Sequence, residues 1–75
     1  MKKAIFVFST LTFTQRGREA LRRRGIRTQI IRTPAEYRSG SCGYSLLVIN
    51  RIDESKEILR AMNIPMQGIY PADIE

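Results

Sequence analysis

Two short apolar runs constrain the fold of this chain more than any other feature. Residues 4–8 read AIFVF and residues 46–49 read LLVI, so both are rich in aliphatic, β-branched or aromatic side chains. Continuous apolar runs of this length are typical of strands that are covered on both faces or paired on both sides. We therefore predict two central strands, the second of them within residues 44–50.

A helical pattern follows each of these runs. After the first, apolar or small residues recur at helical spacing from Phe13 until Gly25 supplies a stop signal. Four hydroxyl side chains offer N-cap oxygens for this helix: Ser9, Thr10, Thr12 and Thr14. Gly17 costs about 1 kcal/mol relative to alanine within a helix, so we expect it to allow a close approach to the sheet. After the second run, Asp53 is the expected N-cap of a helix that ends at Asn63.

The two remaining runs fit edge strands. Residues 26–33 alternate apolar and polar side chains before Pro34, and residues 66–70 form a short run before Pro71. The order strand, helix, strand, strand, helix, strand is that of ferredoxin-like domains. We predict an α+β βαββαβ two-layer sandwich with a four-stranded antiparallel sheet. With 75 residues there is room for one core, so residues 1–75 should form a single domain.

Composition narrows the functional classes. The chain is too short for a large self-contained enzyme, which favours a carrier or accessory protein. No run approaches the roughly 20 apolar residues of a membrane span, and we expect a cytoplasmic protein with no membrane partner. There is no histidine and a single cysteine, Cys42, so the usual zinc sites and an internal disulfide are excluded. Neither a metal nor another cofactor is expected.

Basic residues concentrate in the first half of the chain. Up to Gly40, ten basic and two acidic residues give +8, whereas three basic and five acidic residues after it give −2. Six arginines lie in or near the first predicted helix: Arg16, Arg18, Arg22, Arg23, Arg24 and Arg27. They suit an anionic partner such as an acidic protein patch, RNA or a small anion, while the alternative is a solvated helix face.

The segment before the third strand holds the only thiol. A cysteine becomes a nucleophile as the thiolate, and a nearby cation or converging backbone N–H groups lower its pKa from about 8.5. Arg38 lies four residues before Cys42 and Arg32 lies near the end of the preceding strand, so either guanidinium could approach the sulfur. Ser41 could donate a hydroxyl. Gly40 and Gly43 can adopt positive φ values that turn backbone N–H groups toward an anion. The alternative is a structural cysteine in an ordinary turn.

Several short motifs resemble a bacterial family of selenium/sulfur carrier-like proteins. They span nearly the whole chain: FVFST at 6–10, GI at 25–26, TP at 33–34, SCG at 41–43 and GIY at 68–70. Domains of this family are also similar to the C-terminal domain of a selenium-metabolism protein. The resemblance carries the family's cysteine-glycine pair onto Cys42 and Gly43. Where many members have arginine after the proline, this chain has Ala35.

The resemblance implies a carrier that holds sulfur or selenium on Cys42 as a persulfide or selenopersulfide. Donor and acceptor proteins would be its partners, and the basic helix, through Arg16, Arg22 and Arg23, would dock an acidic donor. The terminal atom would be held by Arg38, Ser41, Gly40 and Gly43.

Two alternatives from other classes stay open. An RNA-binding domain shares this element order and would stack bases on Tyr44 and on Phe6 or Phe8, although Leu46 stands where another aromatic residue is expected, so nucleic acid is disfavoured. An interaction module could form a homodimer through a sheet edge, with an apolar patch supplied by Tyr37, Met66 and Tyr70.

Overall fold

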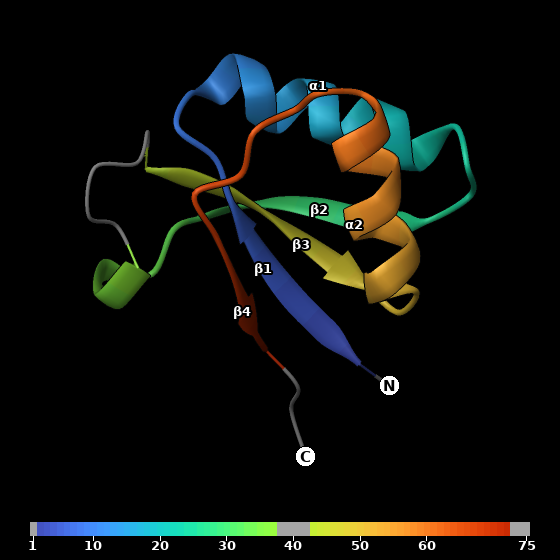
Figure 1. The fold of residues 1–75 in the computed structure, drawn as a ribbon. Helices are drawn as coiled ribbons and strands as arrows, with labels where there is room; N and C mark the ends of the chain where they lie inside the picture. Colours follow the sequence, from blue (N-terminus) through green and yellow to red (C-terminus); the bar gives the residue numbers. More distant parts are fainter. Residues whose placement is uncertain (1, 38–42, 73–75) are drawn as a thin grey trace.

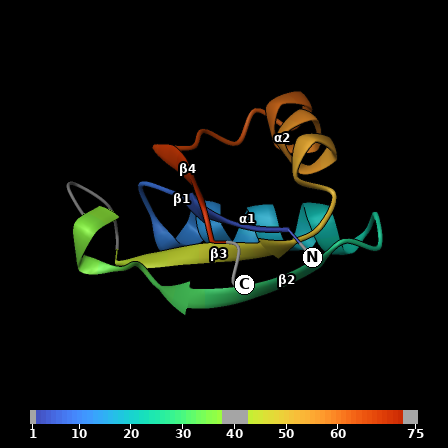
Figure 2. The ribbon, with the colours of Figure 1, turned by 90° about the horizontal axis from the view of Figure 1, so that it is seen from below.

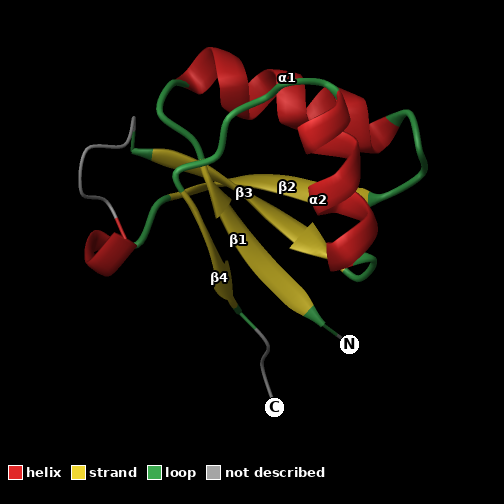
Figure 3. Cartoon of the chain, in the orientation of Figure 1, coloured by secondary structure: helices red, strands yellow, loops and turns green. Residues whose placement is uncertain are grey.

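A computed structural model describes residues 2–37 and 43–72 of the chain. The helices and strands follow the predicted order (Figure 1): β1 Lys3–Val7, α1 Leu11–Arg22, β2 Arg27–Arg32, the 3-10 turn η1 Ala35–Tyr37, β3 Tyr44–Ile49, α2 Ile52–Ala61 and β4 Gly68–Pro71. Figure 3 shows η1 as a short turn apart from the two long helices. The predicted ferredoxin-like α+β sandwich is confirmed.

The four strands form one antiparallel sheet in the order β2-β3-β1-β4 (Figure 2). The two apolar runs occupy the central strands β1 and β3, and the proline-flanked runs lie at the edges, as predicted. Strand β4 includes Pro71, which pairs with Ala4 rather than lying beyond the strand. Proline is tolerated there because it is the last residue of an edge strand.

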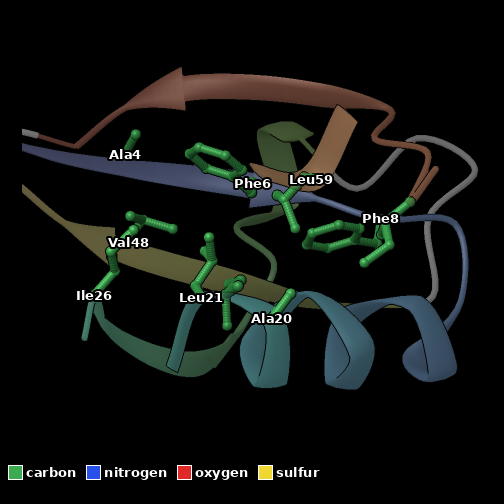
Figure 4. Packing of buried hydrophobic residues seen from close by; sticks show 10 residues of the cluster. Ala4, Phe6, Phe8, Ala20, Leu21, Ile26, Val48 and Leu59 are labelled. Atoms are coloured by element: carbon green, nitrogen blue, oxygen red, sulfur yellow. The ribbon is translucent and has the colours of Figure 1, made fainter. Parts of the chain in front are cut away.

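Both helices pack on one face of the sheet, and the core lies between the two layers. The fully buried side chains include Phe6 and Phe8 from the first apolar run, Leu21 from α1 and Leu59 from α2. Figure 4 shows Phe6, Phe8 and Leu59 pointing toward one another across this space. Within the described residues, no helix is long and apolar enough to cross a membrane.

Gly17 allows the close approach expected of it. A Cβ atom at this position would lie 3.0 Å from Cζ of Phe8 and 3.5 Å from Cδ2 of Leu59. The contacts are therefore with the residue that follows β1 and with α2. A larger side chain would push the two helices apart.

The start of α1 uses Thr10, one of the four predicted N-cap residues, whereas the start of α2 differs from the prediction. Helix α1 begins at Leu11, because the hydroxyl of Thr10 accepts a hydrogen bond from the N–H of Phe13 at 3.1 Å. Asp53 as N-cap of α2 is wrong, since Asp53 lies in the first turn and Arg51 occupies the N-cap position. Arg51 has a left-handed backbone (φ 53°) and makes no side-chain cap. Its guanidinium instead donates to both carboxylate oxygens of Glu54, at 2.9 and 2.7 Å.

Candidate functional site

The predicted cysteine site can be described only through its two flanks. Cys42, Arg38, Gly40 and Ser41 lie outside the described residues, so their roles stay predictions. Tyr37 of η1 precedes this segment, and Gly43 follows it. Each flank makes a contact with a strand or strand end of the sheet, Gly43 with Thr33 and Tyr37 with Tyr70.

Gly43 ties the C-terminal flank to the β2–β3 hairpin. Its carbonyl accepts a hydrogen bond from the N–H of Thr33 at 2.9 Å, one residue beyond the register of the two strands. The φ angle of Gly43 is +91°, which confirms the predicted positive φ. A Cβ atom here would meet no other atom of this chain within 4 Å, so the packing of the chain does not require glycine, whereas its positive φ favours it.

A buried polar pair reinforces this end of the hairpin. The hydroxyls of Thr33 and Ser45 form a short hydrogen bond, and neither residue is exposed by more than 1%. Ser45 lies opposite Val7 in the register, on the sheet face that points away from the helices. Because a buried hydroxyl without a partner is costly, this pair favours one arrangement of the two strand ends.

The N-terminal flank is held on the same face of the sheet by stacked rings. The ring of Tyr37 lies parallel to that of Tyr70 in β4, with centroids 4.0 Å apart and an interplanar angle of 8°. Tyr70 in turn covers Gly68, where a Cβ atom would lie only 2.7–2.9 Å from atoms of the tyrosine side chain. The stack therefore connects η1, which follows one edge strand, with the other edge strand.

This stack was missed by sequence reasoning. An exposed apolar patch of Tyr37, Met66 and Tyr70 was one possibility and ordinary packing of each residue was the favoured one. In the structure the two tyrosines stack and Met66 packs against the core. A signal was present in the alternation of Gly68 and Tyr70, because residues i and i+2 of a strand share a face and an aromatic ring can cover the glycine. The stacking partner Tyr37 is 33 positions earlier in the chain, which no local pattern can indicate.

A small hollow of about 320 Å³ lies beside the stacked rings. It is lined by Val7, Glu36, Tyr37, Gln67 and Tyr70. Val7 is only 1% exposed although α1 and α2 lie on the opposite face of the sheet. The two flanks thus lie near one end of the sheet, where β1 ends and where β3 and β4 begin.

The three arginines predicted to bind a partner are all exposed but do not form one cluster. Arg16 and Arg23 line the same hollow between α1 and the end of α2, together with Met62. Arg22 belongs to neither of the hollows on that seam. The structure therefore brings Arg16 and Arg23 together, but not Arg22.

The aromatic residues proposed to stack RNA bases are mostly inaccessible. Phe6 and Phe8 are both 0% exposed within the core, so neither can contact a base, and Tyr44 alone remains on the surface at 38%. Among the described residues, no group of histidine, cysteine or acidic side chains could hold a metal ion.

A further hollow, of about 580 Å³, lies where α2 begins and has lining residues of both charges. They are Lys2, Lys3, Ala4, Asn50, Arg51, Ile52, Asp53, Glu54, Lys56, Ile69 and Pro71. The hydrogen bond from Arg51 lowers the pKa of Glu54 below its ordinary value; desolvation opposes this effect, and the positive charges of Arg51 and Arg24 add to it. Glu54 in turn raises the pKa of Arg51. This hollow contains none of the predicted site residues.

A family model described as "Putative Se/S carrier protein-like" matches residues 3–71, from the first residue of β1 to the last residue of β4. The chain belongs to this family. No curated protein and no solved structure gave a match. The match to the carrier-like family includes both flanks and the cysteine segment between them, and its name points to interaction with other proteins.

Proposed function

We propose that this protein carries sulfur or selenium on Cys42, as a persulfide or selenopersulfide, between a donor and an acceptor protein. The observation that carries the proposal is the anchoring of both flanks of the cysteine segment. Gly43 is hydrogen-bonded to Thr33 on one side, and Tyr37 is stacked on Tyr70 on the other. Membership of the carrier-like family supports the same function.

The transfer needs one thiol and no cofactor. In loading, the Cys42 thiolate attacks the terminal sulfur of a donor persulfide. A new S–S bond forms at Cys42, the S–S bond of the donor breaks, and its electron pair leaves with the donor thiolate. Delivery repeats this exchange with an acceptor thiolate, and selenium follows the same route through an S–Se bond. No oxidant is consumed in either step.

The residues around Cys42 would hold the anionic terminal atom. We assign this role to the guanidinium of Arg38, the hydroxyl of Ser41 and the backbone N–H groups of Gly40 and Gly43, because hydrogen bonds to a charged group are the stronger ones. The absence of a side chain at Gly43 would leave room for a partner's thiol. Arg16, Arg22 and Arg23 supply positive charge for an acidic donor.

Labelled inorganic polysulfide and intact-mass measurement test the proposal. The wild-type chain should gain one sulfur atom that dithiothreitol removes, whereas Cys42→Ser should gain none while keeping the wild-type circular dichroism spectrum. Replacing Arg38 by Ala should slow loading and raise the midpoint pH of Cys42 alkylation, since a nearby cation stabilises the thiolate. Arg27→Ala, at the opposite end of β2, is the matched control and should change the midpoint less.

Equal sulfur uptake by Cys42→Ser would refute the proposal. So would a Cys42 that reacts with neither polysulfide nor iodoacetamide until urea unfolds the chain, because such a cysteine would be buried and structural.

A further inference from the structure

A groove runs along the seam between α1 and the end of α2, on the helical layer of the molecule. It consists of two adjoining hollows of about 210 Å³ each, which share Ala20, Arg23 and Met62. The remaining lining residues are Arg16, Glu19, Arg24, Ile58, Ala61 and Ile64. This combination of an apolar floor and a basic rim is not required by the fold.

The floor of the groove is exposed and apolar. Met62 is 56% exposed, more than the other two large hydrophobic residues exposed in the described part of the chain, Leu11 and Tyr44. Small side chains at Ala20 and Ala61 leave the groove open beside it. A flexible thioether in such a position adapts to a partner's side chains, and methionine is enriched at interfaces.

The rim of the groove has a net positive charge, because Arg16, Arg23 and Arg24 line it with a single carboxylate, that of Glu19. Arg16 and Arg23 are seven residues apart, so they project from the same side of α1 about 10.5 Å from one another. Neither has an ion-pair partner among the described residues. Helix α2 differs, because three basic side chains at or near it pair with carboxylates three residues away: Arg51 with Glu54, Lys56 with Asp53 and Arg60 with Glu57.

We propose that this groove docks an acidic amphipathic helix of a partner protein. Two carboxylates about two turns apart on that helix would meet Arg16 and Arg23, and an apolar residue between them would cover Met62. Glu19 lies on the same rim and would reject a continuous run of acidic residues, which makes the spacing specific. The inference rests on the part of the proposed function in which these arginines bind an acidic partner, but not on the chemistry of Cys42.

The observations favour an acidic helix over two other occupants of a basic groove, single-stranded RNA and a second copy of this chain. Single-stranded RNA is held by aromatic stacking as well as by charge, and no aromatic residue lines the groove. A second copy of this chain would bring together two molecules of net charge +6, whose α2 carboxylates are already paired.

The test is an NMR titration of the ¹⁵N-labelled protein with a synthetic helical peptide. The peptide has two glutamates seven residues apart, with leucines on the same face between them. Amide shifts should saturate and concentrate at Ala20, Ala61 and Met62, and the affinity should fall as salt is added. A control peptide with glutamine in place of the two glutamates should bind about tenfold more weakly or worse.

Paired charge reversals on α1 separate the groove from general attraction. Arg16→Glu with Arg23→Glu should weaken binding about tenfold or more, whereas Arg18→Glu with Arg27→Glu changes the net charge equally and should weaken it much less. The second pair is a valid control because both arginines are exposed, one on α1 and one on β2, and neither lines the groove. Met62→Gln should also weaken binding without altering the salt dependence.

Three results would overturn the proposal. The first is equal loss in the two double variants, and the second is shifts centred outside the groove. The third is occupation of the groove by something else, seen either as tighter binding of a single-stranded RNA oligonucleotide or as concentration-dependent shifts at Met62 with no peptide present. Sulfur loading of the same samples, measured in parallel, would show that a failed titration leaves the role of Cys42 unaffected.

Discussion

Two residues of the GIY motif at 68–70, Gly68 and Tyr70, position the tyrosine stack beside the cysteine segment. Gly68 is compatible with the ring of Tyr70 only because it has no Cβ atom, and that ring then supports Tyr37. One glycine thus allows a contact that connects η1 with the edge strand β4.

Replacing Gly68 by Ala should therefore destabilise the protein by about 1–3 kcal/mol, because the new Cβ atom would displace the ring of Tyr70. Urea unfolding measures the effect. In a Tyr70→Ala background the same change should cost much less, since the clashing ring is gone. Additive costs in the double variant would show that the glycine acts through something other than Tyr70.

At the scale of elements, both helices end in the same motif. Gly25 (φ 74°) and Asn63 (φ 56°) each occupy a left-handed position just after a helix. The following residues, Ile26 and Ile64, donate to carbonyls five residues earlier, both at 3.0 Å, and are buried with the rest of the core. This is the pattern of a Schellman motif with its hydrophobic contact.

A left-handed backbone is less favourable for Asn63 than for Gly25. Substitutions at these two positions should therefore change the free energy of unfolding in opposite directions. Asn63→Gly should stabilise the protein by up to about 1 kcal/mol, and Gly25→Ala should destabilise it by about 1 kcal/mol or more. Gln15→Gly, at an exposed position within α1, is the control and should destabilise by about 1 kcal/mol. Midpoints of urea denaturation measure these changes in stability. A loss of stability in Asn63→Gly would contradict the prediction.

At the scale of the whole molecule, different features lie on the two faces of the sheet. On one face, the two helices cover the core and form the basic groove between them. The tyrosine stack and the hollow beside Val7 lie on the other face. Arg51 connects the helices near one end of the sheet, because it binds Glu54 and also donates to the carbonyl of Arg24 at 3.3 Å.

This connection should make stability depend on pH. The pKa of Glu54 is lowered in the folded chain, so its contribution is present above the unfolded pKa and is lost as pH falls through the folded pKa. The unfolding free energy of wild type should therefore exceed that of Glu54→Gln near neutral pH and approach it in acid. The effect should be small because the pair is exposed. A difference that does not change with pH would exclude this origin.

The sequence alone determined the order of the elements, the central position of the two apolar runs and the basic first helix, because periodicity and charge are local properties of the chain. The start of α2 was less predictable. Arg51 replaced Asp53 as the N-cap through a left-handed backbone and an ion pair that propensity does not indicate. The stack of Tyr37 on Tyr70 and the groove between Arg16 and Met62 were decided only by the tertiary structure, since each joins residues far apart in the chain that folding brings into contact.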